Sequence, residues 1–462
     1  MTSPGRSLST LPEEILSQIL DQSTLNGTTL HAGVQHPKRV YSELRALALV
    51  CRRIHRLVTP LLFEGITFYH EYVCPSCIKD RSIVPPCRRA LALHRVLRDN
   101  PPLRAKCLSL DIIIDDTADT SDEDFQVAND LITWLTRTRS LRFYGGFHEG
   151  VSEGQRANAL ALIRNASKGM VQLKEFLLDG DEFNSRGLSL AEAMENISFP
   201  SLEVLAMISN GPSDPADLRR MLSSKKSRGA PFTSLTLKYC KDLPEAIEQF
   251  VYWPKQLVDF TVNTSGNKLV SRVSLRDAQK WLSIHKDTLK YLYIDLLGHD
   301  QGLHFDASIF SRLEALRLSR TQLNDEDDRW NNDLRWEPSH ADRVLSPKLQ
   351  TFGMSFGIMG CCLINNFGDK EVNWLRCLGK AAASKRSALD TIEILFNPLS
   401  AYPHKYGAYP EDYGYPWDRI SGLQAELARY GIDLVYNSPP WTKEEWEAMI
   451  SRWLSESVAV GS

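Results

Sequence analysis

The stretch RLEALRLSR, residues 312–320, carries the pattern on which the fold depends. Leu313 is followed three residues later by Leu316, and Leu318 comes two residues after that. Side chains two positions apart in a strand point to the same face, so Leu316 and Leu318 indicate a short strand with one buried face. The stretch therefore predicts a β-strand that must pack its apolar side against another element.

Nine other stretches repeat this pattern loosely along the chain. They are residues 106–114, 140–146, 172–180, 201–209, 232–240, 256–264, 288–297, 348–356 and 389–397. Helix-like pieces lie between them at residues 125–138, 156–167, 216–226, 243–253, 275–286 and 372–385. A strand–helix unit that cannot bury its own apolar face is stabilised by stacking on its neighbours. The sequence therefore predicts a curved α/β solenoid with a parallel sheet on its concave side.

This array resembles degenerate leucine-rich repeats. Its strands recur every 24 to 42 residues or so, against about 20 to 29 residues in regular leucine-rich repeats. A doubly wound α/β domain is the alternative fold. The Gly-rich phosphate-binding turn typical of many such domains does not occur in the sequence.

The first sixty residues contain a different pattern, that of two amphipathic helices. In STLPEEILSQIL, residues 9–20, Thr10 and Glu13 have the spacing of a capping box, and Pro12 is tolerated in a first helical turn. The apolar residues at helical spacing in this stretch are Leu11, Ile15, Leu16, Ile19 and Leu20. A second apolar series occupies residues 44–61, with arginines on its other face. A helical domain of this size is too small to bury all these groups by itself, so a partner surface is expected.

These two helical stretches resemble the F-box. LPEEILSQIL and LALVCRRIHRLVTPLLF carry the resemblance, which covers residues 8–65. It implies a module that docks on the adaptor subunit of a cullin-based (SCF-type) ubiquitin ligase. The positions that match the motif, and that are therefore expected to bind the adaptor, are Leu11, Pro12, Ile15, Leu16, Ile19, Leu20, Leu49, Val50, Cys51, Arg52, Leu57 and Phe63.

One departure from the F-box pattern lies between the two helices. The connection at residues 21–41 is longer than usual and is interpreted as an inserted loop that leaves the docking face intact. The alternative interpretation of the N-terminal helices is an ordinary helical cap on the solenoid, because core helices show the same apolar periodicity.

The C-terminal stretch WTKEEWEAMISRWLSES, residues 441–457, predicts a terminal helix. Thr442 and Glu445 have the spacing of a capping box, and Trp441 and Trp446 that of a hydrophobic staple. The expected buried stripe consists of Trp446, Met449, Ile450, Trp453 and Leu454. Because a solenoid needs a terminal unit over its last open face, we interpret this helix as a cap. The segment from residue 415 onward resembles the end of fungal F-box proteins.

Composition and charge argue against several classes of function. The net charge is -3, whereas nucleic-acid and anionic-membrane partners normally require a basic field. No apolar run approaches the roughly 20 residues that cross a bilayer, and the N-terminus lacks a secretory signal. The nine cysteines are interpreted as free thiols in a reducing compartment. We therefore expect an intracellular protein, cytoplasmic or nuclear or both.

Two constellations could carry metal chemistry. His70, Cys74, Cys77 and Cys87 offer an imidazole and three thiols, which suit zinc, but a second C-x-x-C pair is absent. We expect structural thiols and no bound metal or other cofactor. The acidic stretch 115–125 lacks the glycine of a calcium loop and is interpreted as a solvated segment before a helix N-terminus.

Two long interruptions of the array, residues 319–348 and 397–418, are the expected target-binding segments. Loops of this length are usually functional or disordered, and aromatic side chains are enriched at interfaces. The proposed anchors are Trp330, Trp336, Tyr406, Tyr409 and Tyr413. The rival interpretation is that these rings pack against the chain's own last repeats.

The sequence predicts four segments and a non-catalytic role. They are an F-box-like helical domain (1–65), a linker or helical connection (66–100), a leucine-rich-repeat-like solenoid (101–440) and a C-terminal capping helix and tail (441–462). The expected function is a substrate receptor of an SCF-type ligase, with an adaptor, through it a cullin, and an unidentified target protein as partners. An interaction scaffold without a ligase role is the second hypothesis. An enzyme with an unrecognised site is the third, although no common catalytic motif is present.

Overall fold

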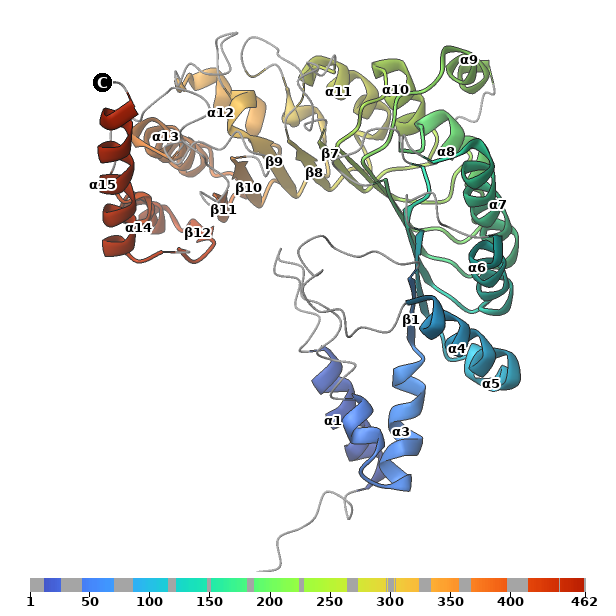
Figure 1. Ribbon diagram of the computed structural model, residues 1–462. Coiled ribbons are helices and arrows are strands. Elements are labelled where there is room, and N and C mark those ends of the chain that lie inside the picture. The colour runs from blue at the N-terminus through green and yellow to red at the C-terminus, as the bar shows by residue number, and fades with distance from the viewer. Residues whose placement is uncertain are drawn as a thin grey trace, which may run out of the picture. The chain divides into compact units, whose positions relative to one another are not determined.

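The computed structural model describes most of the chain (Figure 1). The described residues are 12–25, 44–69, 86–114, 122–147, 151–180, 187–223, 228–263, 273–295, 297, 303, 305–323, 334–356, 367–396, 414–439 and 441–460, with the backbone alone at 21–25, 69, 86–89 and 453–460. The chain divides into two compact units. One comprises residues 1–146, 150–176 and 199–201, and the other comprises residues 147–149, 177–198 and 202–462.

The protein is α/β, with a 12-stranded open sheet whose strands follow one another in chain order. The strands are β1 (Gly65–Tyr69), β2 (Ser109–Ile114), β3 (Ser140–Gly145), β4 (Glu175–Asp179), β5 (Val204–Ile208), β6 (Ser234–Lys238), β7 (Asp259–Asn263), β8 (Tyr291–Ile294), β9 (Ala315–Ser319), β10 (Thr351–Ser355), β11 (Thr391–Leu395) and β12 (Asp433–Tyr436). Neighbouring strands pair in parallel, as in β9 with β10. Each of the ten stretches predicted from the apolar pattern contains one of these strands.

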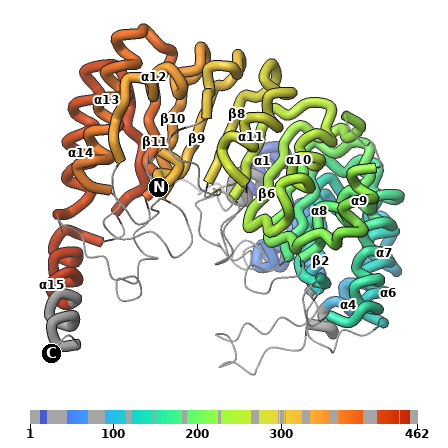
Figure 2. The backbone as a smooth tube through the Cα atoms, turned by 90° about the horizontal axis from the view of Figure 1, so that it is seen from above, coloured from blue at the N-terminus to red at the C-terminus, as the bar shows by residue number. Residues whose placement is uncertain are grey.

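Helices connect the strands. The α-helices are α1 (Glu13–Leu25), α3 (Arg52–Leu62), α4 (Pro86–Asp99), α5 (Pro101–Arg104), α6 (Asp122–Trp134), α7 (Glu153–Gly169), α8 (Leu190–Asn196), α9 (Pro215–Ser223), α10 (Pro244–Tyr252), α11 (Leu275–Leu282), α12 (Pro338–Val344), α13 (Asp369–Lys385), α14 (Pro416–Leu427) and α15 (Lys443–Val460). Short 3-10 helices include η3 (Ser283–His285), η5 (Arg320–Leu323) and η8 (Ala428–Tyr430). In the second unit, α12, α13 and α14 lie along the same side of β9 to β11 (Figure 2).

The core of the array is built from the apolar pattern itself. In the strand–helix repeat that contains β9, Leu313, Leu316 and Leu318 are all completely buried. The next repeat places Leu349, Phe352 and Met354 at the equivalent positions, and all three are fully buried. Leu349 just precedes β10, and the strand register pairs Phe352 with Leu316 and Met354 with Leu318. Alternate side chains of each strand therefore point toward the helices, which explains why the period of two in the sequence predicted these strands correctly.

A recurring pattern of backbone hydrogen bonds links successive strand–helix repeats of the array. Just before many of the strands, one carbonyl oxygen accepts from two consecutive amide N–H groups of the next repeat. The accepting residues in the second unit are Glu203, Thr233, Val258, Lys290, Glu314 and Gln350, with N···O distances of 2.8 to 3.2 Å. The same backbone geometry therefore recurs although the connections differ in length, as expected of stacked structural repeats.

Two parts of the structure go beyond the sequence analysis or correct it. Strand β1 begins at Gly65 and continues into the segment 66–100, which the sequence predicts to be a connection, and it pairs in parallel with β2. Residues 319–348, interpreted as one long loop, contain η5 and α12. These three elements were missed because they are short and lack the repeated apolar triplet.

Helix ends follow the sequence signals closely. Helix α6 begins at Asp122, and its first turn carries three acidic residues, which suit the positive end of the helix dipole. At α15 the backbone N–H of Thr442 donates to Glu445 and that of Glu445 donates to the Thr442 hydroxyl, so the predicted capping box is confirmed. The rings of Trp441 and Trp446 lie 5.9 Å apart, as expected for the staple.

A buried histidine joins α10 to the strand that follows it. His285 is 1% exposed. Its Nδ1 accepts from the backbone N–H of Leu257 at 3.2 Å, so its Nε2 carries the proton and donates to the carbonyl of Val251 at 3.0 Å. The ring is therefore held as the neutral tautomer. Burial keeps the pKa of His285 below its usual value, and the nearby Arg228 guanidinium acts in the same direction.

We expect the stability of the second unit to decrease at mildly acidic pH because of His285. Between the lowered pKa of the folded state and about pH 6.5, the imidazole is protonated in the unfolded chain but neutral in the folded one. The unfolded state then binds more protons, so the free energy of unfolding falls with falling pH, by at most about 1.4 kcal/mol per pH unit from this one group. In H285Q the amide can make the same two hydrogen bonds without titrating. Urea unfolding at pH 7.5 and pH 5.5 should therefore show a smaller loss for the variant; an equal loss in both proteins would contradict this role.

Candidate docking surface

The N-terminal helices form a small module with a core of its own. Leu20 of α1 packs with Leu44, Ile54 and Val58, and all four are buried. Leu47, Ala48, Leu57, Leu61 and Leu62 surround this cluster as partly buried residues. The side chains that hold the two helices together are therefore few, as expected for a helical domain of this size.

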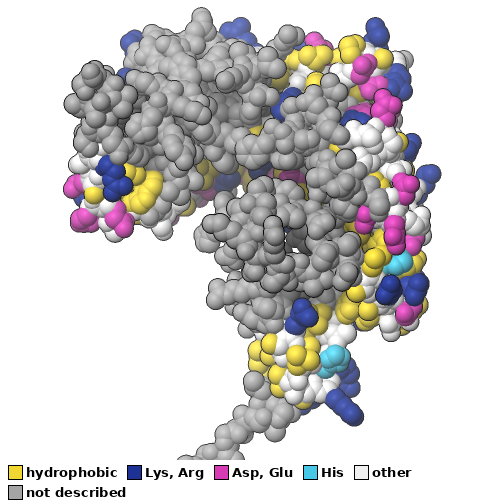
Figure 3. All heavy atoms as spheres, viewed as in Figure 1, with side chains coloured by type: hydrophobic (Ala, Val, Ile, Leu, Met, Phe, Trp, Pro, Cys, Tyr) yellow, Lys and Arg dark blue, Asp and Glu magenta, His cyan; other side chains and the backbone are white. Residues whose placement is uncertain are grey.

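A second set of apolar side chains in the same module points away from this core. On α1, Ile15 is 41% exposed and Ile19 is 44% exposed. They lie four residues apart and so occupy one face of the helix. In the turn before α3, Leu49 is 86% exposed and Val50 is 65% exposed. Hydrophobic side chains gather on the surface of this module, beside basic ones (Figure 3).

Backbone geometry fixes the turn that presents Leu49 and Val50. The N–H of Leu49 donates to the carbonyl of Ala46, and the N–H of Val50 donates to that of Leu47, both at 3.1 Å. Cys51 then begins α3 as its N-cap residue, and its Sγ accepts from the N–H of Ile54 at 3.5 Å. The two exposed side chains are thus held on an ordered turn next to a helix end.

Polar contacts tie the parts of the module together. Arg56 of α3 donates to a carboxylate oxygen of Glu13 on α1 at 2.8 Å. The ring of His55 lies 3.1 Å from the carbonyl of Ala48. The ion pair is exposed and contributes little stability, but it connects the start of α1 to α3.

The structure separates the twelve predicted adaptor-binding residues into groups. The exposed ones are Pro12, Ile15, Ile19, Leu49, Val50, Cys51 and Arg52. Leu16 and Leu20 are buried at 5% and 7% exposure, and Leu57 and Phe63 are partly buried. Leu11 lies outside the described residues. Direct contact with a partner is therefore expected from the exposed group, and support of the module from the buried pair.

Of the five proposed target anchors, the structure describes Trp336. Its ring is half-buried and meets the ring of Trp374 edge-on, with centroids 5.2 Å apart, and that of His340 at 5.8 Å. Trp330, Tyr406, Tyr409 and Tyr413 lie outside the described residues. For Trp336 these contacts favour the interpretation that the ring packs against the chain's own repeats.

We expect W336A to destabilise the second unit. Replacing a fully buried tryptophan costs about 3–5 kcal/mol, and roughly half of that applies to a half-buried ring. Thermal unfolding should show a clearly lower midpoint, because Trp374 and His340 lose a packing partner. An unchanged midpoint together with lost binding of a target would contradict this packing role and show that Trp336 binds the target.

Two of the thiols that the structure describes, those of Cys107 and Cys240, are buried and have little reactivity. Burial raises the pKa of Cys107 and that of Cys240 to about 12, so both remain protonated and are poor nucleophiles and poor metal ligands. In the part of the chain that the structure describes, no three His, Cys, Asp or Glu residues are grouped as a metal site would require. His70, Cys74 and Cys77 lie outside that part, and the side chain of Cys87 is not described.

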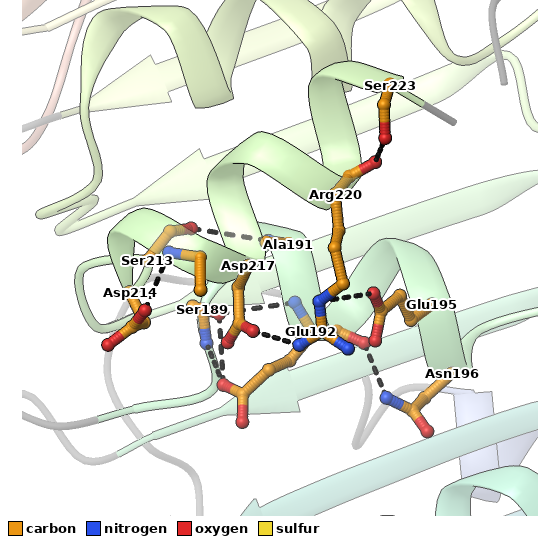
Figure 4. A network of polar contacts seen from close by, with 11 residues as sticks. Ser189, Ala191, Glu192, Glu195, Asn196, Ser213, Asp214, Asp217, Arg220 and Ser223 are labelled. Atoms are coloured by element: carbon orange, nitrogen blue, oxygen red, sulfur yellow. Dashed lines mark hydrogen bonds and ion pairs between the residues drawn. The ribbon is translucent and has the colours of Figure 1, made fainter. Parts of the chain in front are cut away.

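A network of polar contacts in the second unit joins α8 to α9 and has a structural role (Figure 4). Ser189 and Glu192 form a capping box at the start of α8. Arg220 of α9 pairs with Asp217 and approaches Glu195 at 3.8 Å. Nearby, the buried Asp242 accepts from the hydroxyl of Ser213 at 2.7 Å and from backbone N–H groups. These carboxylates are occupied with helix ends and ion pairs, so the network offers no free acid–base pair.

The comparisons with known proteins add no family. The chain matches neither a model of a known protein family nor a curated protein. Among the helices that the structure describes, none is long and apolar enough to cross a membrane.

Proposed function

We propose that the chain is a substrate-receptor subunit of an SCF-type cullin ubiquitin ligase. Residues 1–65 act as an F-box-like module that binds the adaptor, and through it the cullin. The sheet-and-helix array acts as a leucine-rich-repeat-like solenoid that binds a target protein, with α15 as its terminal cap. The chain itself performs no catalysis and needs no cofactor, and it works in the cytoplasm, the nucleus or both.

The observation that carries this proposal is the exposed apolar set on the N-terminal module. A soluble monomer gains nothing from leaving Leu49 and Val50 in water at 86% and 65% exposure on a hydrogen-bonded turn. The same module also exposes Ile15 and Ile19, and all four positions belong to the F-box-like pattern. A partner surface that covers them accounts for both the pattern and the exposure.

The array supports the second half of the proposal. Its recurring buried triplet, as in Leu313, Leu316 and Leu318, and its repeated backbone hydrogen bonds are features of stacked strand–helix repeats. Such arrays offer an extended surface for binding other proteins. The mechanism is then proximity: binding raises the effective concentration of the target near the ubiquitin carrier that the ligase holds.

Affinity purification from the native cell tests the proposal. The tagged chain should copurify with a ligase adaptor and a cullin in stoichiometric amounts. The chain with Leu49 and Val50 changed to aspartate should lose both, yet keep any target protein. Recovery of targets without adaptor or cullin from the unmodified chain would instead support the interaction scaffold without a ligase role.

A further inference from the structure

In the described part of the N-terminal module, acidic and basic residues lie mostly in different stretches, and Glu64 directly follows the basic one. Residues 44–63 contain four arginines and no aspartate or glutamate, in a chain whose net charge is -3. The described part of α1 and the residue before it, 12–25, contain Glu13, Glu14 and Asp21 and no basic residue. Charge of one sign is therefore gathered around the turn that presents Leu49 and Val50.

Two of these arginines flank the exposed turn and are themselves exposed. Arg45 lies four residues before Leu49, and Arg52 lies two residues after Val50. Among the described residues, neither guanidinium forms an ion pair. Arg56 differs from them because it pairs with Glu13. The free positive charge of the surface therefore lies beside its most exposed apolar side chains.

The position of Arg52 is unfavourable for the helix that it begins. Arg52 is the first residue of α3, and the first turn of α3 contains no acidic residue. A cation at this end opposes the helix dipole and reduces helix stability. A residue that violates a local rule in this way without a compensating contact points to a role outside the fold.

We propose that Arg45 and Arg52 form a basic rim around Leu49 and Val50. This basic rim steers the module onto a surface of its adaptor where an acidic patch faces the two arginines. This inference rests on the proposed function and adds the charge of the partner surface and the orientation of docking. The apolar side chains supply affinity through burial, whereas the two arginines accelerate encounter and fix register. A phosphate polymer would bind a basic field too, but it offers no apolar surface to cover Leu49 and Val50.

Association kinetics with the purified adaptor test the basic rim. For the unmodified full chain, the association rate constant should fall steeply between about 0.01 M and 0.15 M salt, over which the Debye length shrinks from about 30 Å to about 8 Å. The double variant R45E/R52E should associate about tenfold or more slowly at the lower salt and lose most of the salt dependence. Because R52E places a carboxylate at a helix N-terminus, the variant should remain folded.

A charge-matched variant separates the local effect from the total charge. R137E/R164E changes two exposed arginines outside the module and lowers the net charge by the same amount. Its association rate should stay within about twofold of the unmodified chain at both salt concentrations. Equal slowing by both variants, or no slowing by R45E/R52E while the adaptor still binds, overturns the basic rim and leaves the proposed function standing. Absence of adaptor binding by the unmodified chain overturns both.

Discussion

Changing Ile15 and Ile19 together to aspartate should weaken binding of the adaptor by at least about 100-fold. Each side chain is partly exposed in the free chain and would be covered in the complex. Losing the burial of one such side chain costs about 1–3 kcal/mol, and a carboxylate without a partner in the interface adds to that cost. Since about 1.4 kcal/mol corresponds to a factor of ten in affinity, a combined loss of about 3 kcal/mol or more from the two buried side chains and the two unpaired carboxylates exceeds two orders of magnitude.

The choice of residues in this experiment matters because their neighbours are structural. Leu16 lies beside Ile15 in the sequence but is only 5% exposed, so an aspartate there would unfold the module whatever its function. A matched control changes Val171 and Leu222, which are 52% and 44% exposed outside the module, to aspartate. The control should bind normally. If I15D/I19D still binds the adaptor with its helices intact, α1 is not part of the docking surface.

Breaking the buried ion pair between Arg320 and Glu371 should cost about 3–5 kcal/mol of stability in the second unit. The Nε of Arg320, in η5, donates to Glu371 of α13 at 2.9 Å, and both side chains are about 5% exposed or less. The other carboxylate oxygen of Glu371 accepts from the N–H of Gly368 at 2.7 Å. In E371A the arginine remains buried without its counter-charge, which is the expensive part of the change.

Two further variants distinguish this cost from an ordinary ion-pair effect. The double variant R320M/E371M removes both charges and should recover most of the loss, because a buried pair can be replaced by apolar groups at little cost. K443A breaks the exposed pair with Asp418, at 51% and 57% exposure, and should change stability by at most about 1 kcal/mol. Urea unfolding measures all three. A similar small effect for E371A and K443A would contradict the buried role.

Much of the array could be predicted from sequence because its signal is repeated and local. The period of two in RLEALRLSR and its nine relatives follows from burial of one strand face, and each of the ten stretches does contain a strand. The edge strands β1 and β12 were missed. They lie at the two ends of the sheet, where GITFY and DLVY carry only a short apolar pattern. The sequence alone does not reveal that these short segments pair with β2 and β11.

The docking surface could be predicted only in part. Apolar spacing placed Ile15, Leu16, Ile19 and Leu20 on one stripe, but the structure turns Leu16 and Leu20 inward and Ile15 and Ile19 outward. Adjacent residues on a helix point about 100° apart, so a wide stripe can serve a core and a surface at once. Which edge of the stripe faces the core depends on where α3 packs. The contact between Arg320 and Glu371 was equally hidden, since it joins residues 51 positions apart.

Direct titration of the purified full-length chain with a purified ligase adaptor tests the central claim. Calorimetry at two temperatures should give one adaptor per chain, a dissociation constant at or below about 1 μM, and a negative heat-capacity change from burial of apolar surface. Failure to bind at adaptor concentrations of about 100 μM, with the chain folded, would contradict the account at its centre.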